Sequence, residues 1–219
     1  RDVLMDPYRA VLDRIARACE TCGRDPASVT LVAVTKTRTV DEIRRLVDLG
    51  HRDFGENYLQ EALPKIEALP DDLVWHFVGG LQSKKVRAVA EAFDVIHSFD
   101  RASQIAAMTK VPRVIDGFLQ VNLAEDPKKS GVSPDSLDET ARLLLDCPHV
   151  RFRGSMTIGP DSADAEAGRP IFRRLRELTE SFGLRELSMG MSGDMDVAIQ
   201  EGSTHVRIGT ALFGERPAR

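Results

Sequence analysis

Short apolar runs with the composition of β-strands alternate with longer amphipathic stretches along almost the whole chain. The first run, residues 30–36, is apolar and rich in β-branched residues, which is typical of a strand buried on both faces. Thr39 and Glu42 then form a capping-box pattern that starts a helix ending near Gly50. Further strands are predicted at residues 52–55, 74–78, 94–97, 114–122, 150–157, 184–189 and 205–208.

One amphipathic helix, at residues 7–23, is predicted before the first strand. Pro64 predicts a kink or a split in its helix, because proline lacks the N–H that a helix interior uses. The pair Ser133-Pro134 is typical of a helix start. Between the strands, helices are predicted at residues 57–68, 83–92, 102–111, 133–147, 163–182 and 193–201.

Strands that alternate with helices form a parallel sheet, and eight of them in 219 residues predict a closed (β/α)8 TIM barrel. We therefore expect an α/β fold, namely a single TIM-barrel domain over residues 1–219 with an extra N-terminal helix. An open doubly wound sheet is the alternative. That fold usually has about five or six strands, and its G-x-G-x-x-G fingerprint is absent from this sequence.

The charge balance and the cysteine content exclude several classes of protein. Lys and Arg number 30 against 34 Asp and Glu, a net charge of −4, so we predict no nucleic-acid partner. No apolar run approaches the roughly 18 residues of a membrane span, and three cysteines cannot form a disulfide framework. We therefore expect a cytoplasmic protein with no membrane partner. Cys19 and Cys22 fall on the apolar stripe of the first helix, where buried thiols are expected.

In a barrel of this kind the reactive side chains lie at the carboxyl ends of the strands. Lys36 ends the first predicted strand, directly after an apolar run. Partial removal of an amine from water favours its neutral form, which can attack a carbonyl carbon as a Schiff-base lysine does. A solvated lysine leaving a strand is the alternative interpretation.

The loops after the seventh and eighth strands are where barrels commonly hold phosphate. Ser192 in the first loop can cap the next helix, while its small neighbours expose backbone N–H groups to an anion. Arg207, Gly209 and Thr210 lead into a predicted single helical turn. These segments are either ordinary capped turns or, together with Lys36, a site for a phosphorylated aldehyde or ketone.

Asn57 and the histidines have two interpretations each. Asn57 follows the second strand and either caps its helix or turns its amide toward a ligand beside Lys36. None of the five histidines stands four residues from another, as a helical metal site requires, so we predict no metal. His76 alternates with Trp75 and Phe77 on a strand and faces either the barrel mouth or the core.

The segments that suggest chemistry also carry a family resemblance. The motifs are Val32-Ala-Val-Thr-Lys-Thr37, Phe54-Gly-Glu-Asn-Tyr58 with Gln60-Glu-Ala-Leu-Pro-Lys65, Trp75-His-Phe-Val-Gly79, Leu187-Ser-Met-Gly-Met-Ser192, and Glu201-Gly-Ser-Thr204 with Val206-Arg-Ile-Gly-Thr210. In this order, over nearly the whole chain, they resemble the pyridoxal phosphate homeostasis proteins. This YggS/PROSC-type family comprises single-domain, fold-type III binders of pyridoxal 5'-phosphate (PLP). The resemblance implies a PLP site in which Lys36 is the Schiff-base lysine, Asn57 lies near the cofactor, Arg207 lies by the pyridine nitrogen, and Ser192, Gly209 and Thr210 contact the phosphate.

The resemblance also implies a role in maintaining intracellular PLP and amino-acid balance, without robust enzymatic turnover. PLP is the expected ligand, PLP-dependent apoenzymes and amino acids are candidate partners, and a monomer is expected. Only nine residues follow Thr210, so we expect no second β-domain of the kind that supplies an opposing base in racemases. A permanently protonated Arg207 would leave the cofactor ring a weak electron sink, which is consistent with a binder.

Two enzymatic alternatives stay open. One is a PLP-dependent amino-acid racemase, which turnover of an added amino acid would reveal. The other is a class I aldolase, in which Lys36 would attack a phosphosugar without any cofactor. A visible spectrum separates the aldolase from both PLP proteins, because the aldolase is colourless.

Overall fold

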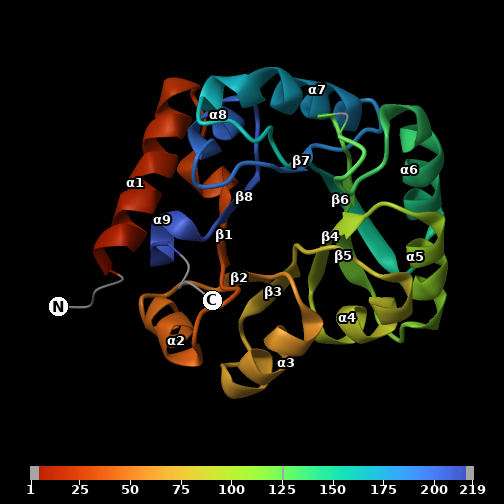
Figure 1. The fold of residues 1–219 in the computed structure, drawn as a ribbon, viewed down its shortest axis with the longest axis horizontal. Helices are drawn as coiled ribbons and strands as arrows, with labels where there is room; N and C mark the ends of the chain where they lie inside the picture. The colour runs from red at the N-terminus through yellow and green to blue at the C-terminus, as the bar shows by residue number, and fades with distance from the viewer. Residues whose placement is uncertain (1–4, 125, 216–219) are drawn as a thin grey trace.

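A computed structural model of the chain describes residues 5–124 and 126–215. Within these residues, eight parallel strands close into a barrel in which each strand pairs with the next and β8 returns to β1 (Figure 1). Ala33 of β1 pairs with Phe54 on one side and with Ile208 on the other. The predicted TIM barrel is confirmed. Its strands are β1 (Thr30–Val34), β2 (Asp53–Glu56), β3 (Val74–Phe77), β4 (Val95–Phe99), β5 (Ile115–Gln120), β6 (Val150–Met156), β7 (Glu186–Ser188) and β8 (His205–Ile208).

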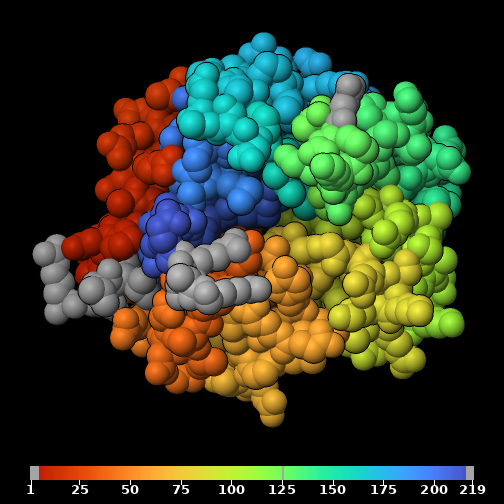
Figure 2. Space-filling model, in the orientation of Figure 1, coloured from red at the N-terminus to blue at the C-terminus, as the bar shows by residue number. Residues whose placement is uncertain are grey.

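Helices cover the outside of the barrel, and the first of them stands apart from the strand–helix repeat. This helix, α1 (Met5–Thr21), packs against α8 and α9, so the N-terminal segment lies directly against C-terminal segments (Figure 1 and Figure 2). The expected extra N-terminal helix is therefore present. The remaining helices are α2 (Val40–Asp48), α3 (Leu59–Ala68), α4 (Val86–Ala92), α5 (Ala102–Ala107), α6 (Leu137–Asp146), α7 (Arg169–Glu180), α8 (Met195–Gln200) and α9 (Thr210–Phe213).

Local sequence signals account for some helix boundaries and miss others. The capping box of α2 is confirmed, since the Thr39 hydroxyl accepts from the N–H of Glu42 and the Glu42 carboxylate accepts from the N–H of Thr39. The pair Ser133-Pro134 starts a 3-10 turn, and α6 begins only at Leu137. Of the kink or split predicted at Pro64, the split is wrong, because α3 runs through Pro64 without interruption.

The core lies between the helices and the sheet, with a smaller cluster inside the barrel formed by Val95, Phe118 and Met156. Cys19 is buried in the main core, but Cys22 is exposed, so the prediction of two buried thiols is half wrong. The helix end explains the difference, since the chain turns at Cys22, after α1 has ended. None of the helices in residues 5–124 and 126–215 has the length and apolar character that crossing a membrane demands.

Candidate functional site

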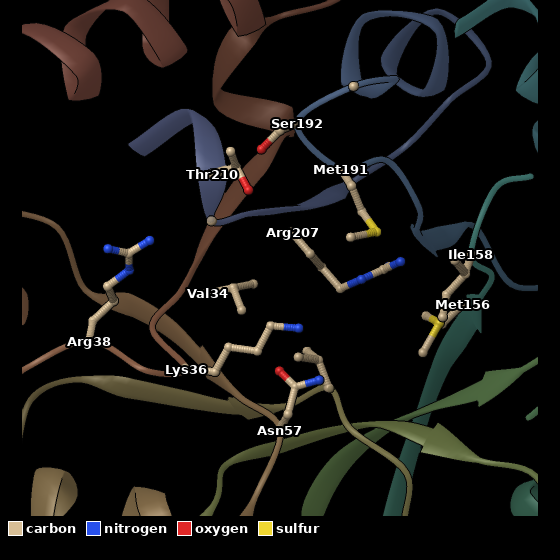
Figure 3. A pocket seen from close by; sticks show the side chains of 13 residues that line it. Val34, Lys36, Arg38, Asn57, Met156, Ile158, Met191, Ser192, Arg207 and Thr210 are labelled. Carbon is tan, nitrogen blue, oxygen red and sulfur yellow. The ribbon is translucent and has the colours of Figure 1, made fainter. Parts of the chain in front are cut away.

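A cavity of about 400 Å³ opens at the carboxyl end of the barrel strands (Figure 3). Its volume lies within the range of small-molecule sites. The structure brings all six of the site residues proposed from the sequence into its lining, namely Lys36, Asn57, Ser192, Arg207, Gly209 and Thr210. The remaining lining residues are Val34, Arg38, Val78, Met156, Ile158, Met191 and Gly193.

Lys36 lies two residues beyond the end of β1, and its side chain points into the cavity beside Asn57 (Figure 3). The next residue, Thr37, has a φ of 67°, in the left-handed region that a β-branched residue rarely adopts. Its N–H donates to the carboxylate of Glu61 on α3. The sharp turn that presents Lys36 to the cavity is therefore held by a side chain from the neighbouring strand–helix unit.

A buried ionic cluster formed by Glu56, Glu61 and Lys65 braces the residue on the other side of Lys36. The Lys65 ammonium donates to the carbonyl of Thr35 at 2.8 Å and to the Glu56 and Glu61 carboxylates at 3.0 and 3.2 Å. The hydroxyl of Thr35 donates to Glu56, whose side chain is fully buried. Burial raises the pKa of Glu56, and the contacts with Thr35 and Lys65 only partly oppose this. Both neighbours of Lys36 are thus tied to one buried cluster.

Asn57 does not cap its helix, because Tyr58 occupies the cap position of α3. Its amide oxygen is instead buried without a hydrogen-bond partner in the described part of the chain. Gly79 permits the backbone of β3 to pass close to this residue, since a Cβ at Gly79 would lie 2.2 Å from the Asn57 carbonyl oxygen. A buried acceptor without a partner is costly, so the arrangement suits a ligand that brings a donor.

Ser192 links the two loops at the opposite side of the cavity. Its hydroxyl accepts from the N–H of Ala211 at 3.1 Å, in the first turn of α9. The expectation that Ser192 caps α8 is wrong, because Asp194 takes that position and accepts from the N–H of Met191. Arg14 of α1 also donates to the Ser192 carbonyl. Ser192 and Thr210 consequently lie together at one edge of the cavity (Figure 3).

Arg207 of β8 is buried, with 4% of its surface exposed. Its guanidinium donates through Nη1 to the Ser188 hydroxyl at 2.7 Å and through Nη2 to the Thr157 carbonyl at 3.0 Å. Burial lowers the pKa of Arg207 to about 10, although the charge of Asp194 opposes the shift. The guanidinium therefore remains protonated at neutral pH.

Sequence reasoning missed the apolar half of the cavity and Arg38. The apolar side chains are Val34, Val78, Met156, Ile158 and Met191, which give the cavity walls suited to a flat ring. Met156 ends β6, so the strand-end argument that selected Lys36 would also have selected it. The Arg38 guanidinium lies over the Phe213 ring, with its carbon 5.4 Å from the ring centroid, and donates to the Gly214 carbonyl. The local sequence around Arg38 does not predict these contacts.

A barrel of eight parallel strands with a lysine just beyond β1 and two small-residue loops after β7 and β8 is the fold of one known class of protein. Residues 9–217 match the family model of the alanine racemase N-terminal domain. Alanine racemase from Corynebacterium glutamicum has this fold, with a TM-score of 0.70 at 19% identity over 94% of this chain and 61% of that chain.

Closer relatives define the family within this class. A pyridoxal phosphate homeostasis protein of Pseudomonas aeruginosa is 46% identical over 94% of this chain and 93% of its own length, and that of Escherichia coli K12 is 41% identical. PipY of Synechococcus elongatus, whose structure has PLP bound, is 36% identical with a TM-score of 0.79, covering 92% of this chain and all of that one. The chain belongs to the pyridoxal phosphate homeostasis protein family.

Proposed function

We propose that this protein binds PLP covalently through Lys36 and contributes to PLP and amino-acid homeostasis without robust catalysis. The observation that carries the proposal is the convergence of all six site residues on one cavity. Its donors match the groups of the cofactor. The Lys36 amine would attack the aldehyde, the hydroxyls and backbone N–H groups of the two loops would hold the phosphate, and the Arg207 guanidinium would donate to the pyridine nitrogen.

The unpartnered amide oxygen of Asn57 and the apolar walls add to this fit. When bound, PLP supplies an aldehyde carbon that an amine can attack and a ring that withdraws electrons. The protein's own residues hold and orient it. Lys36 provides the amine, and Ser192, Gly209 and Thr210 provide donors at the phosphate.

Two features of the cavity favour a carrier over an enzyme. The guanidinium of Arg207 donates hydrogen bonds but keeps its proton, so it leaves the ring nitrogen unprotonated. Among the lining residues, the titratable side chains are Lys36, Arg38 and Arg207, so Lys36 is the single candidate base. A racemase needs acid–base groups on both faces of its substrate, and this lining supplies one.

The proposal extends to the surroundings in which the protein acts. We infer one PLP-binding domain over residues 1–219, acting as a cytoplasmic monomer that passes PLP to PLP-dependent apoenzymes and responds to amino acids. The family membership supports this role, because its curated relatives are named for PLP homeostasis.

Borohydride reduction of the PLP-loaded protein tests the site. We expect a visible absorption band before reduction and, after proteolysis, a pyridoxyl label on the peptide that contains Lys36. A label chiefly on Lys129 would move the site. Incubation with L-alanine, L-serine or L-glutamate tests the racemase alternative, since turnover of about 1 s⁻¹ or more would make the protein an enzyme. A colourless protein that cleaves a phosphosugar would favour the aldolase.

A further inference from the structure

Three histidines, His76, His97 and His205, occupy the barrel interior beneath the cavity. His76 and His97 are 2% and 0% exposed, and the rings of all three pack against one another. The interior of a TIM barrel is usually filled by bulky branched apolar residues, and burying imidazoles costs free energy unless they are hydrogen-bonded. The proposed PLP chemistry uses none of these three side chains.

Two of the histidines belong to an unbroken chain of hydrogen bonds that begins at Arg207. Its Nη1 contacts the Ser188 hydroxyl at 2.7 Å, and the same hydroxyl contacts Nδ1 of His97 at 2.7 Å. Nε2 of His97 contacts Nδ1 of His76 at 2.9 Å, and Nε2 of His76 contacts the Asp53 carboxylate at 2.9 Å. We call Ser188, His97, His76 and Asp53 the interior relay.

The interior relay crosses the barrel from one end to the other. Arg207 lines the cavity at the carboxyl ends of the strands. Asp53 is the first residue of β2, and it lies beside Thr30 and Leu31, which begin β1. Its side chain is 29% exposed. A buried cationic group in the cavity is thus connected to a partly exposed carboxylate at the opposite end.

The chemistry of the groups gives the relay a direction. Burial raises the pKa of Asp53, but the hydrogen bond from His76 and the nearby histidines together outweigh it and keep the pKa below its ordinary value, so the carboxylate only accepts. His76 therefore carries a proton on Nε2, and in its neutral form Nδ1 is an acceptor. With His76 neutral, as the proposal requires, His97 donates from Nε2. Because burial holds the pKa of His97 well below its ordinary value, His97 is neutral and its Nδ1 accepts from Ser188.

Every link consequently points the same way, from Arg207 through Ser188, His97 and His76 to Asp53. The Ser188 hydroxyl donates its hydrogen to Nδ1 of His97, so its oxygen lone pairs accept from the Arg207 guanidinium. Aligned donors of this kind polarise one another. Within the described residues no carboxylate forms an ion pair with Arg207: Asp194 acts on it through its charge, and Asp53 is linked to it through the hydrogen bonds of the relay. His205 stands outside the relay, since its Nδ1 contacts the Thr204 hydroxyl.

We propose that the interior relay positions the Arg207 guanidinium for the cofactor ring, so that Asp53, at the far end of the barrel, influences how tightly the cavity holds PLP. The proposal rests on the proposed function for its ligand. Ser188, His97, His76 and Asp53 are positioning residues in this scheme, because they would act through Arg207 and not by touching the cofactor.

The direction of the relay is tested first, in protein without PLP, by ¹⁵N NMR of the histidine rings at neutral pH. In the wild type we expect both His76 and His97 to carry their proton on Nε2. In Asp53→Asn we expect a mixture of tautomers, with protons also on Nδ1 of either ring. A proton on Nδ1 of His97 in the wild type would mean that the relay runs the other way and would overturn the proposal.

The coupling to the cavity is tested by titrating Asp53→Asn with PLP. We expect the dissociation constant to rise at least about fivefold, the lower end of typical site-to-site coupling. Asp116→Asn is the matched control, because Asp116 is 26% exposed near the start of β5 and pairs with Arg151 outside the relay. Ser188→Ala, which breaks the contact with Arg207 itself, should weaken PLP binding more than Asp53→Asn does.

Equal dissociation constants for wild type, Asp53→Asn and Asp116→Asn would refute the coupling. Failure of the wild type to bind PLP at Lys36 would instead refute the proposed function, and the NMR measurement would still report the direction of the relay. The two failures are therefore distinguishable.

Discussion

The two walls of the cavity are held in place by different kinds of interaction. The β1–β2 wall carries Lys36 and Asn57 and is braced by the buried ionic cluster of Glu56, Glu61 and Lys65. The β7–β8 wall carries Ser192, Gly209 and Thr210. It is braced by hydrogen bonds from backbone N–H groups to side-chain oxygens, namely from Ala211 to the Ser192 hydroxyl and from Met191 to the Asp194 carboxylate.

The difference fits what each wall would hold in the proposed function. A single amine must point in one direction, so the turn around Lys36 is held through Thr35 by the buried Lys65–Glu56 pair and through Thr37 by the partly exposed Glu61. An anion is held by several donors at once, so each one can be weaker and more easily replaced. We therefore expect single substitutions to be severe on the β1–β2 wall and mild on the β7–β8 wall.

Removal of the Lys36 amine should have the largest effect on binding. In Lys36→Ala we expect PLP retention to fall at least about 100-fold, because the covalent attachment is lost. Folding stability should change by less than about 1 kcal/mol, since a strand-end side chain in an open cavity packs against little. Dialysis followed by absorbance measures retention, and urea unfolding measures stability. Lys84→Ala, at an exposed lysine, is the control, and equal losses in both variants would contradict the assignment.

Lys65 tests the brace behind that amine. Lys65→Met leaves the fully buried Glu56 carboxylate without its cation, which should cost about 3–5 kcal/mol of folding stability. The control is Arg87→Met, which removes the exposed ion pair with Glu91 and should cost less than about 1 kcal/mol. Urea denaturation compares the two variants. Adding Glu56→Gln to Lys65→Met should restore part of the loss, and if it does not, the cluster is not the brace.

The sequence predicted Lys36 but not this cluster, and the reason is physical. Strand ends in a TIM barrel converge on one face, so a rule about position was enough for Lys36, Arg207 and the loops after β7 and β8. Glu56 and Lys65 come from a strand and a helix whose charged residues look solvated in the sequence. Only the packing of α3 against β2 brings them together.

The same limit explains the orientation of His76 and the helix boundaries. Both neighbours of His76 on β3 are large and apolar, so alternation could not decide between mouth and core, and the structure buries it in the barrel interior beneath the cavity. Ser192 had a helix-capping pattern, but Asp194 occupies the N-cap position of α8, and the Ser192 hydroxyl instead accepts from the N–H of Ala211 in the first turn of α9. Local preference predicted these elements to within a few residues, while their partners depended on tertiary contacts.

Hydroxyl removal on the β7–β8 wall should have a smaller effect than either lysine change. In Ser192→Ala and in Thr210→Val we expect PLP affinity to fall tenfold to a hundredfold, about 1–3 kcal/mol, because each loses one donor while backbone N–H groups remain. Attachment at saturating PLP should persist. Titration with PLP provides the measurement, and Thr109→Val, another exposed threonine, is the control. Unchanged affinity in both site variants would place the phosphate elsewhere.

The mildest test uses pH to compare one buried carboxylate from each side of the barrel. Burial raises the pKa of Glu56 above its ordinary value of 4.5. The Glu56 carboxyl therefore stays protonated to a higher pH in the folded protein than in the unfolded chain. Proton binding stabilises the fold at low pH, and this stabilisation is lost as the pH rises through the folded-state pKa. Compared with Glu56→Gln, the wild type should gain stability between pH 7 and pH 5, as measured by urea unfolding.

Glu201, between α8 and β8, should respond in the opposite direction. Burial raises its pKa, but the hydrogen bonds from Arg173 and Arg169 and the charges of Arg173 and Arg176 together outweigh burial and leave the pKa below 4.5. Its stabilisation is then present above pH 4.5 and lost as the pH falls through the lowered value. Compared with Glu201→Gln, the wild type should hold its advantage from pH 7 to pH 5 and lose it towards pH 4. If both comparisons moved in the same direction, Lys65 would compensate Glu56 as fully as the arginines of α7 compensate Glu201.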